Sequence, residues 1–210
     1  MAPNQGVENW GDRIRDLVGS GTPLDLGEAL GLISICRQQA EVRQSFDRYA
    51  ARTAVDSKRL QAVAESLHQT EAACQTIGPG AFLDGQALAL RFYESGSIGA
   101  AALVAREYPE LASRLPRNDF FGQMKKDAYA GDESSIGLLA KSRAQGMAHD
   151  EYLGFQLALS ALADGEAPSA GGHFGRLFRE AVGAVSPEAQ RVSAALLEAV
   201  AEARRKANGR

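Results

Sequence analysis

The stretch from Leu24 to Ile77 constrains the fold of this chain most, because it contains no proline and its glycines, Gly27 and Gly31, lie near its start. It ends at the Gly-Pro-Gly of residues 78–80, a strong helix terminator. Within it, a stripe of fourteen positions recurs every three or four residues, and ten of them are apolar: Leu32, Ile35, Gln39, Val42, Phe46, Tyr49, Thr53, Asp56, Leu60, Val63, Leu67, Thr70, Cys74 and Ile77. Such a stripe is typical of helices that pack along their length.

Two structures are consistent with this stripe. A single helix of 54 residues would be about 80 Å long and would need a partner to cover the stripe. A helical hairpin would instead bury the stripe against itself. The pattern becomes polar from Thr53 to Lys58, where Asp56 or Ser57 could cap a second helix. We therefore favour a hairpin with its turn at 53–58 over the continuous helix, although neither glycine nor proline marks the turn.

The two cysteines of the chain, Cys36 and Cys74, lie opposite each other if the hairpin turns near residue 55. A disulfide between them would close a loop of 38 residues, which stabilises a protein by about 3–4 kcal/mol in the chain-entropy model. One alternative is a pair of unrelated buried thiols, since free cysteine packs as a small apolar side chain. The other is a nucleophilic cysteine, which needs a nearby base, and His68 lies on a different helical face from Cys74. In the hairpin, we expect the Cα atoms of the two cysteines within about 7 Å of each other.

The remainder of the chain is rich in helix formers, without the period-two alternation of strands. We predict an all-α fold, a helical hairpin or coiled coil followed by a short repeat-like helical array with C-terminal capping helices. The segments are 1–21, which includes a short helix from Trp10 to Val18; 22–79, the hairpin; 80–165, the array; and 173–207, the C-terminal helices.

Two Ser/Thr-Pro pairs mark helix starts. Thr22-Pro23 and Ser186-Pro187 each combine an N-cap residue with a proline at the first helical position. The last helix ends in the basic run Arg204–Arg210, where the helix dipole favours positive charge. We interpret this run as a solvated helix end rather than a binding site for phosphate.

Residues 80–115 and 118–153 resemble each other at an offset of 38, and Ser-Ile-Gly at 97–99 matches Ser-Ile-Gly at 135–137. Periods of about 34–40 residues are typical of stacked helix-pair repeats. The offset predicts that Ile98 and Ile136 occupy equivalent core positions. The second copy, with Ala-Tyr-Ala-Gly-Asp at 128–132, Gly146 and Ala-Leu-Ser-Ala at 158–161, resembles a Sel1-like repeat, a relative of the tetratricopeptide repeat. This resemblance implies a protein-binding scaffold without catalytic residues of its own.

Charge, hydropathy and the N-terminus bear on partners and location. The formal net charge of −3 and the isoelectric point of about 5.7 argue against nucleic-acid binding, which needs a basic surface. No run approaches the ~18 apolar residues of a membrane span, and the first residues do not resemble a signal peptide. We expect a cytoplasmic protein if the chain is complete, and a periplasmic or secreted one if a signal peptide was removed, as a disulfide would favour.

Three motifs have the spacing of a metal or anion site. Glu65 and His68 share a helical face, but a di-iron bundle needs a second Glu-x-x-His, which the sequence lacks. His149-Asp150 is similar to the dyad of metal phosphohydrolases, which requires more histidines before it than the sequence supplies. The glycine-rich run 171–175, which includes His173, lacks the Lys-Ser/Thr of a phosphate loop. We therefore expect no metal and no cofactor.

The sequence is best interpreted as a non-enzymatic helical protein–protein interaction module, such as a bacterial immunity protein, an inhibitor or an adaptor. Partner binding would fall to the array or to one face of the hairpin. The candidate contacts on the array are acidic: Asp132, Glu133, Asp150 and Glu151. The alternative is a hydrolase-like enzyme whose site is built from scattered carboxylates.

Overall fold

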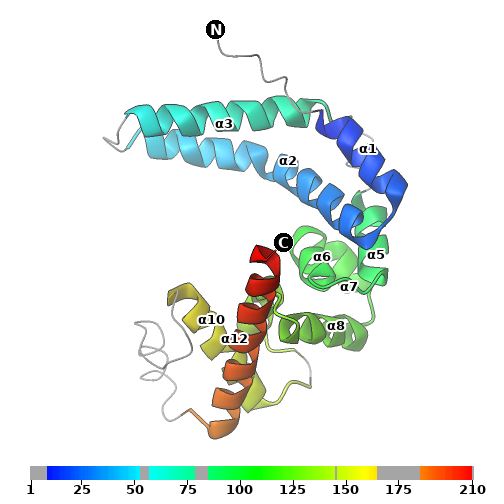
Figure 1. Cartoon of the computed structure of the whole chain (residues 1–210), viewed down its shortest axis with the longest axis vertical. Coiled ribbons are helices and arrows are strands. Elements are labelled where there is room, and N and C mark those ends of the chain that lie inside the picture. Colours follow the sequence, from blue (N-terminus) through cyan, green and yellow to red (C-terminus); the bar gives the residue numbers. More distant parts are fainter. Residues whose placement is uncertain (1–8, 53–56, 79–84, 145, 165–184, 210) are drawn as a thin grey trace. The chain divides into compact units, whose positions relative to one another are not determined.

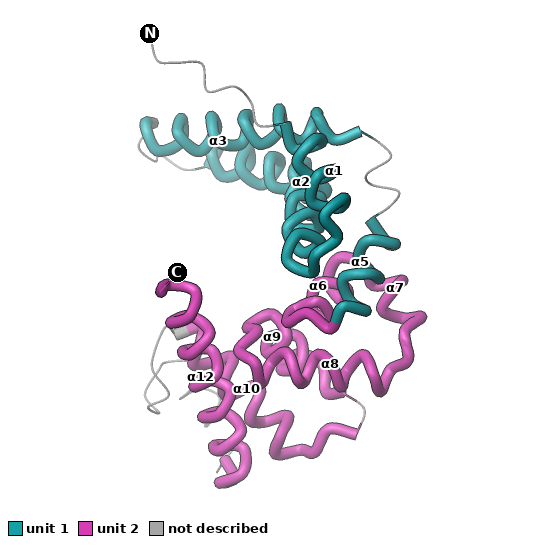
Figure 2. Tube along the Cα trace, turned by 45° about the vertical axis from the view of Figure 1, so that its right-hand side comes forward, with its two compact units in different colours: residues 1–95 teal, residues 96–210 magenta. Residues whose placement is uncertain are grey.

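A computed structural model describes residues 9–52, 57–78, 85–144, 146–164 and 185–209. These residues form helices joined by turns and contain no strand, which confirms the predicted all-α class (Figure 1). No helix in the described part of the chain is both long enough and apolar enough to cross a membrane. The chain divides into two compact units, Met1–Ser95 and Gly96–Arg210 (Figure 2).

The first unit contains the helical hairpin. Its described helices are α1 (Trp10–Ser20), α2 (Pro23–Ala50), α3 (Ser57–Gln75) and α5 (Gly85–Glu94). The long helices α2 and α3 lie side by side, and the chain folds back between residues 50 and 57 (Figures 1 and 2). The predicted hairpin is therefore confirmed and the continuous helix is wrong.

Local capping fixes where the first two helices begin. The side chains of Asn9 and Thr22 accept hydrogen bonds from the backbone N–H groups of Asp12 and Asp25, and Pro23 is the first residue of α2. Gly21 lies between the helices with φ of 68°, a left-handed conformation that glycine adopts without the steric cost of a side chain. The start of α2 predicted from Thr22-Pro23 is thus confirmed.

The core of the first unit lies at the base of the hairpin. On α2, four apolar side chains are buried, and they pack with α1 and α5: Leu26, Ala29, Leu30 and Ile33. Gly27 allows a close approach here, because a Cβ atom on it would lie 3.1 Å from Cζ of Phe92. The N-terminal part of α2 is therefore covered by neighbouring helices, whereas the part beyond Ile33 has one buried residue, Gln39.

The second unit consists of shorter helices followed by one long helix. They are α6 (Ala100–Glu107), α7 (Pro109–Arg114), α8 (Arg117–Tyr129), α9 (Glu133–Lys141), α10 (His149–Asp164) and α12 (Pro187–Asn208). Ser186 caps α12 through the N–H of Ala189, as the Ser186-Pro187 pair predicts. The rest of the segment 173–207 that precedes residue 185 lies outside the described residues.

Close helix contacts in the second unit depend on glycine. A Cβ atom on Gly154 of α10 would lie 2.5 Å from Cβ of Val192 on α12, and one on Gly131 would lie 2.6 Å from the carbonyl oxygen of Ala199. Large side chains that are less than 2% exposed fill the space between these helices and α9: Ile136, Leu139, Phe155 and Leu196. The second unit thus has a densely packed core.

The predicted equivalence of Ile98 and Ile136 is wrong. Ile136 is fully buried within α9, whereas Ile98 is 62% exposed in the turn before α6. The turn is fixed by Gly99, the N-cap of α6, which has φ of 83°. The two Ser-Ile-Gly triplets therefore have different local structures, and their identity does not define a repeat register. The repeat-like array stays a prediction.

Candidate interaction surface

The outer half of the hairpin is held together by one covalent bond and by side-chain contacts. A disulfide joins Cys36 of α2 to Cys74 of α3, whose Cα atoms lie 5.5 Å apart, so the expected proximity of the cysteines is confirmed. Closer to the tip, Nε2 of Gln39 donates a hydrogen bond to the carbonyl oxygen of Leu67 at 3.1 Å. These two contacts show which sides of α2 and α3 face each other.

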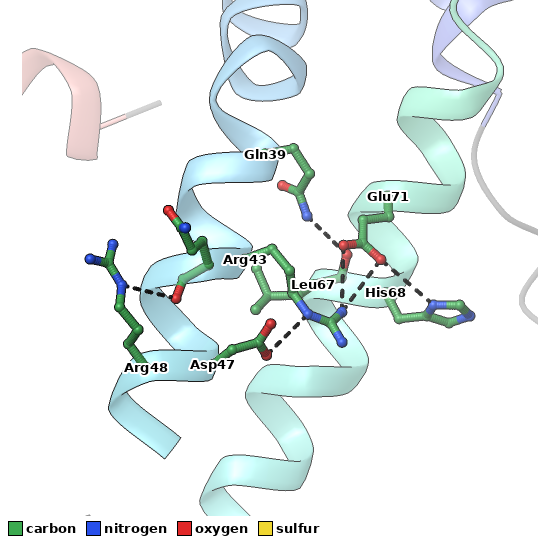
Figure 3. Close-up of polar contacts among 8 residues, drawn as sticks. Gln39, Arg43, Asp47, Arg48, Leu67, His68 and Glu71 are labelled. Carbon is green, nitrogen blue, oxygen red and sulfur yellow. Dashed lines mark hydrogen bonds and ion pairs between the residues drawn. The ribbon is translucent and has the colours of Figure 1, made fainter. Parts of the chain in front are cut away.

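A polar network bridges α2 and α3 of the hairpin (Figure 3). The guanidinium of Arg43 donates to the carboxylate of Asp47 at 3.3 Å and to that of Glu71 on α3 at 3.4 Å. Nδ1 of His68 lies 3.9 Å from the same Glu71 carboxylate. His68 thus faces Glu71 rather than forming a site with Glu65, and its side chain is 81% exposed.

The hairpin leaves four large apolar side chains about half exposed. On α2, Ile35, Val42 and Tyr49 follow one another at intervals of seven residues and are 46%, 45% and 53% exposed. On α3, Val63 is 48% exposed. We name these four residues the apolar face. All four belong to the stripe that was expected to be buried within the hairpin, so the hairpin buries the stripe only in part.

The helical repeat places three of these side chains on one side of the hairpin and the fourth close to the seam between its helices. With Cys36 against Cys74, successive residues turn by about 100°, so that Ile35, Val42 and Tyr49 project to the same side of α2. The same construction on the antiparallel helix α3 places Val63 close to the seam with α2 and turned slightly toward that side. Asp47 of α2 is likewise close to the seam but turned toward the other side, where His68 projects. Ile35, Val42 and Tyr49 therefore project to one side of the hairpin, Val63 lies between them and the seam, and the polar network bridges the seam between α2 and α3.

A second surface feature is a shallow groove of about 520 Å³ on α8, lined by Gly122, Lys125, Lys126, Tyr129 and Ala130. Lys125 forms an ion pair with Glu151 at 2.7 Å. Burial raises the pKa of Tyr129, and the nearby carboxylates of Glu151 and Glu188 raise it further. The ring of Tyr129 packs edge-to-face on Phe155 at a centroid distance of 6.0 Å. Its ring and the paired lysine therefore connect α8 to α10.

The four acidic candidates for partner binding lie at the starts of two helices. Asp132 caps α9 by accepting from the N–H of Ser135 at 2.8 Å. Glu133 accepts from Arg204 at 2.8 Å, a bond that raises the pKa of this arginine. Glu151 pairs with Lys125, and Asp150 lies in the first turn of α10. The structure thus assigns stabilising contacts to three of the four, and their partner binding stays a prediction.

A buried carboxylate that sequence reasoning missed lies within the second unit. Asp127 of α8 is 1% exposed, and its Oδ1 accepts a hydrogen bond from Gln123 at 2.7 Å. Burial raises the pKa of Asp127, while hydrogen bonds from Gln123 and from the backbone N–H groups of Gly99 and Ala101 oppose that rise. Asp127 therefore links α8 to the start of α6. Its spacing in the sequence carries no signal of this contact, because the two segments are almost thirty residues apart.

The remaining motifs do not come together. In the described residues, no group of three His, Cys, Asp or Glu side chains has the arrangement of a metal site. His149 is the exposed first residue of α10. The run 171–175 and His173 lie outside the described residues. Among the basic residues at the end of α12, Arg204 has its partner in Glu133, and Lys206 pairs with Glu202 at 2.7 Å.

Comparisons of the chain with protein-family models, with curated proteins and with solved structures found no match.

Proposed function

We propose that this protein is a helical protein–protein interaction module and that it binds its partner through the apolar face of the hairpin. The observation that carries the proposal is the grouping of four apolar side chains, each about half exposed, on the disulfide-linked helices α2 and α3: Ile35, Val42, Tyr49 and Val63. Scattered apolar residues are normal on a surface, whereas a contiguous patch is typical of a binding site.

The distribution of polar groups supports the same surface. The ion pairs that join Arg43 to Asp47 and to Glu71 lie at the seam between α2 and α3, and Ile35, Val42 and Tyr49 project to one side of that seam. Depletion of charge at the centre of a patch and enrichment in aromatic side chains such as Tyr49 are typical of protein interfaces. The hairpin therefore offers a partner one surface that can lose its water at little cost.

The disulfide supports a rigid binding surface and an oxidising location. A cross-link between Cys36 and Cys74 restricts how α2 and α3 can slide, so less conformational entropy is lost when a partner binds. Disulfides persist in the periplasm and outside cells but are rare in the cytosol. The proposal therefore places the interaction module in an oxidising compartment.

The experiment is site-specific photo-crosslinking in the cells of origin. A photoreactive amino acid replaces Val42 on the apolar face or, as a matched control, Gln44 on the other side of the same helix. We expect a protein adduct from position 42 that is absent from position 44 and that disappears when Val63→Glu is added. Circular dichroism should show that Val63→Glu folds normally, because its site is half exposed. Equal adducts from both positions would refute the proposed surface.

A further inference from the structure

We infer that the occupant of the apolar face is a second copy of this chain, bound antiparallel so that the tip of one hairpin lies on the base of the other. This inference rests on the proposed function and names its partner. The two hairpins would form a four-helix bundle, with the apolar faces of both copies in its core.

The spacing of the apolar face fits such a bundle. Ile35, Val42 and Tyr49 repeat at seven residues, the period at which a straight seam continues along packed helices. A single two-helix layer has one buried interface and leaves its flanks in water, whereas two stacked layers bury four helices around a common core. Because a two-fold interface is self-complementary, Val42 at the centre of the stripe would lie near the symmetry axis.

The charges of the hairpin favour the antiparallel arrangement over the parallel one. The tip, residues 43–60, carries five basic and two acidic residues, and Arg43 among them pairs within the chain with Asp47 and Glu71. The base, residues 23–42 and 61–77, carries one basic and five acidic residues, of which Glu28 pairs with Arg13 and Glu71 with Arg43. Outside these ion pairs, the tip has four basic residues and the base has three acidic ones. In an antiparallel pair each basic tip lies on an acidic base, whereas a parallel pair brings tip to tip. Charge complementarity of this kind selects orientation and partner more than it adds affinity.

The first test measures the molar mass of the full-length oxidised protein by sedimentation velocity over a range of concentrations. We expect a dimer for the natural chain and for Gln44→Glu on the other side of α2. Val42→Glu should weaken the dimer at least tenfold, because the interface would have to bury an unpaired charge at its centre. Equal circular dichroism of the two variants excludes misfolding as the cause. A natural chain that stays monomeric at high concentration would overturn the inference.

The second test determines whether the two copies pack antiparallel or parallel. Cysteines are introduced separately as Gly31→Cys at the base and Arg52→Cys at the tip, and the two proteins are mixed and treated with a short bis-maleimide linker. A Cβ atom at Gly31 meets no other atom within 4 Å, and Arg52 is exposed, so both changes are expected to be tolerated. The two positions are 21 residues apart, a separation of about 30 Å at the helical rise per residue.

An antiparallel pair brings position 31 of one copy to position 52 of the other, so the mixture should give dimer cross-links that neither protein gives alone. Cross-links between identical positions would indicate a parallel pair and overturn the arrangement. A monomeric chain whose position 42 still captures a different protein would refute self-association and leave the proposed function standing. Failure of both the mass measurement and the photo-crosslink would refute both.

Discussion

Two pairs of long helices in this protein are held together by different means. Between α10 and α12, Gly154 brings the backbone of one helix against Val192 of the other, and the neighbouring side chains of Phe155 and Leu196 are fully buried. Between α2 and α3 beyond the base of the hairpin, the described contacts include the Cys36–Cys74 disulfide, an amide hydrogen bond and an ion pair.

The difference reflects how many neighbours each pair has. The helices α10 and α12 also contact α9 and α8, respectively, so their flanks are covered and packing alone can stabilise them. The outer hairpin is a single layer of two helices, and its flanks, including Val42 and Val63, stay about half exposed. A covalent link then supplies stability that the small buried area does not, and the uncovered flank becomes available for a partner.

Removing the disulfide should produce the largest effect and should be confined to the first unit. For the loop of 38 residues between the cysteines, the chain-entropy model predicts that Cys36→Ser combined with Cys74→Ser lowers the free energy of unfolding by about 4 kcal/mol. The single tryptophan, Trp10, lies in α1 and reports on this unit. Denaturant unfolding followed by its fluorescence measures the loss. An unchanged midpoint would show that packing suffices in the hairpin.

A cavity in the second unit should come next in size. Ile136→Ala removes three methyl or methylene groups from a fully buried position in α9, and a cost of about 3 kcal/mol is expected. Its control is Ile98→Ala, the other isoleucine of the Ser-Ile-Gly pair, which is 62% exposed and should change stability by less than about 0.5 kcal/mol. Circular dichroism during urea unfolding measures the loss of unfolding free energy in both variants. Equal losses would indicate that Ile98 and Ile136 occupy equivalent buried positions, which contradicts the structure.

The two identical Ser-Ile-Gly triplets show which features the sequence alone can predict and which it cannot. Helix starts at Thr22 and Ser186 could be predicted, because a cap is a local contact between residues three apart. The hairpin and its cysteine pair could be predicted as well, since a turn near residue 55 fixes which residues of α2 and α3 face each other. A three-residue match such as Ser-Ile-Gly, in contrast, contains no information on whether a neighbouring helix covers the isoleucine.

The same limit explains the features of the site that were missed. The pattern of the stripe correctly grouped Ile35, Val42 and Tyr49, but periodicity defines a shared face and not what covers it. The pair of Glu133 with Arg204 joins residues 71 positions apart, and Asp127 of α8 meets the start of α6, almost thirty residues earlier in the chain. Such contacts depend on tertiary structure, which a single sequence pattern does not encode.

The close approach of α10 and α12 can be tested by adding a single methyl group. Gly154→Ala places a Cβ atom 2.5 Å from Cβ of Val192 and 3.0 Å from the carbonyl oxygen of Ala189, so the helices must separate, at a cost of about 2 kcal/mol. The matched control is Gly122→Ala in α8, where the methyl group meets no atom within 4 Å and should stabilise the helix by about 0.5–1 kcal/mol. Thermal unfolding by circular dichroism should show opposite shifts, and a stabilised Gly154→Ala would contradict the packing described for this pair.

The smallest expected effect is a pH dependence that the second unit owes to Asp127. Burial raises the pKa of this carboxyl in the folded protein above its ordinary value of about 3.9. The folded state therefore binds a proton more tightly than the unfolded chain between these two pKa values. Within that window, Asp127 makes the free energy of unfolding fall as the pH rises, by at most about 1.4 kcal/mol per pH unit for one proton. Below and above the window its contribution is constant.

Asp127→Asn removes the titrating group while retaining a side-chain oxygen that can accept from Gln123. Urea unfolding followed by circular dichroism from pH 4 upward should show the natural protein gaining stability relative to this variant as the pH falls. The difference between two slopes is informative even if the asparagine variant is less stable at every pH, because a constant loss shifts a curve without changing its slope. Identical slopes for the natural protein and Asp127→Asn would show that this carboxyl has the same proton affinity in the folded and unfolded states. Burial in the densely packed second unit would then cost the charged carboxylate no more than exposure on the outer hairpin costs the charged groups there.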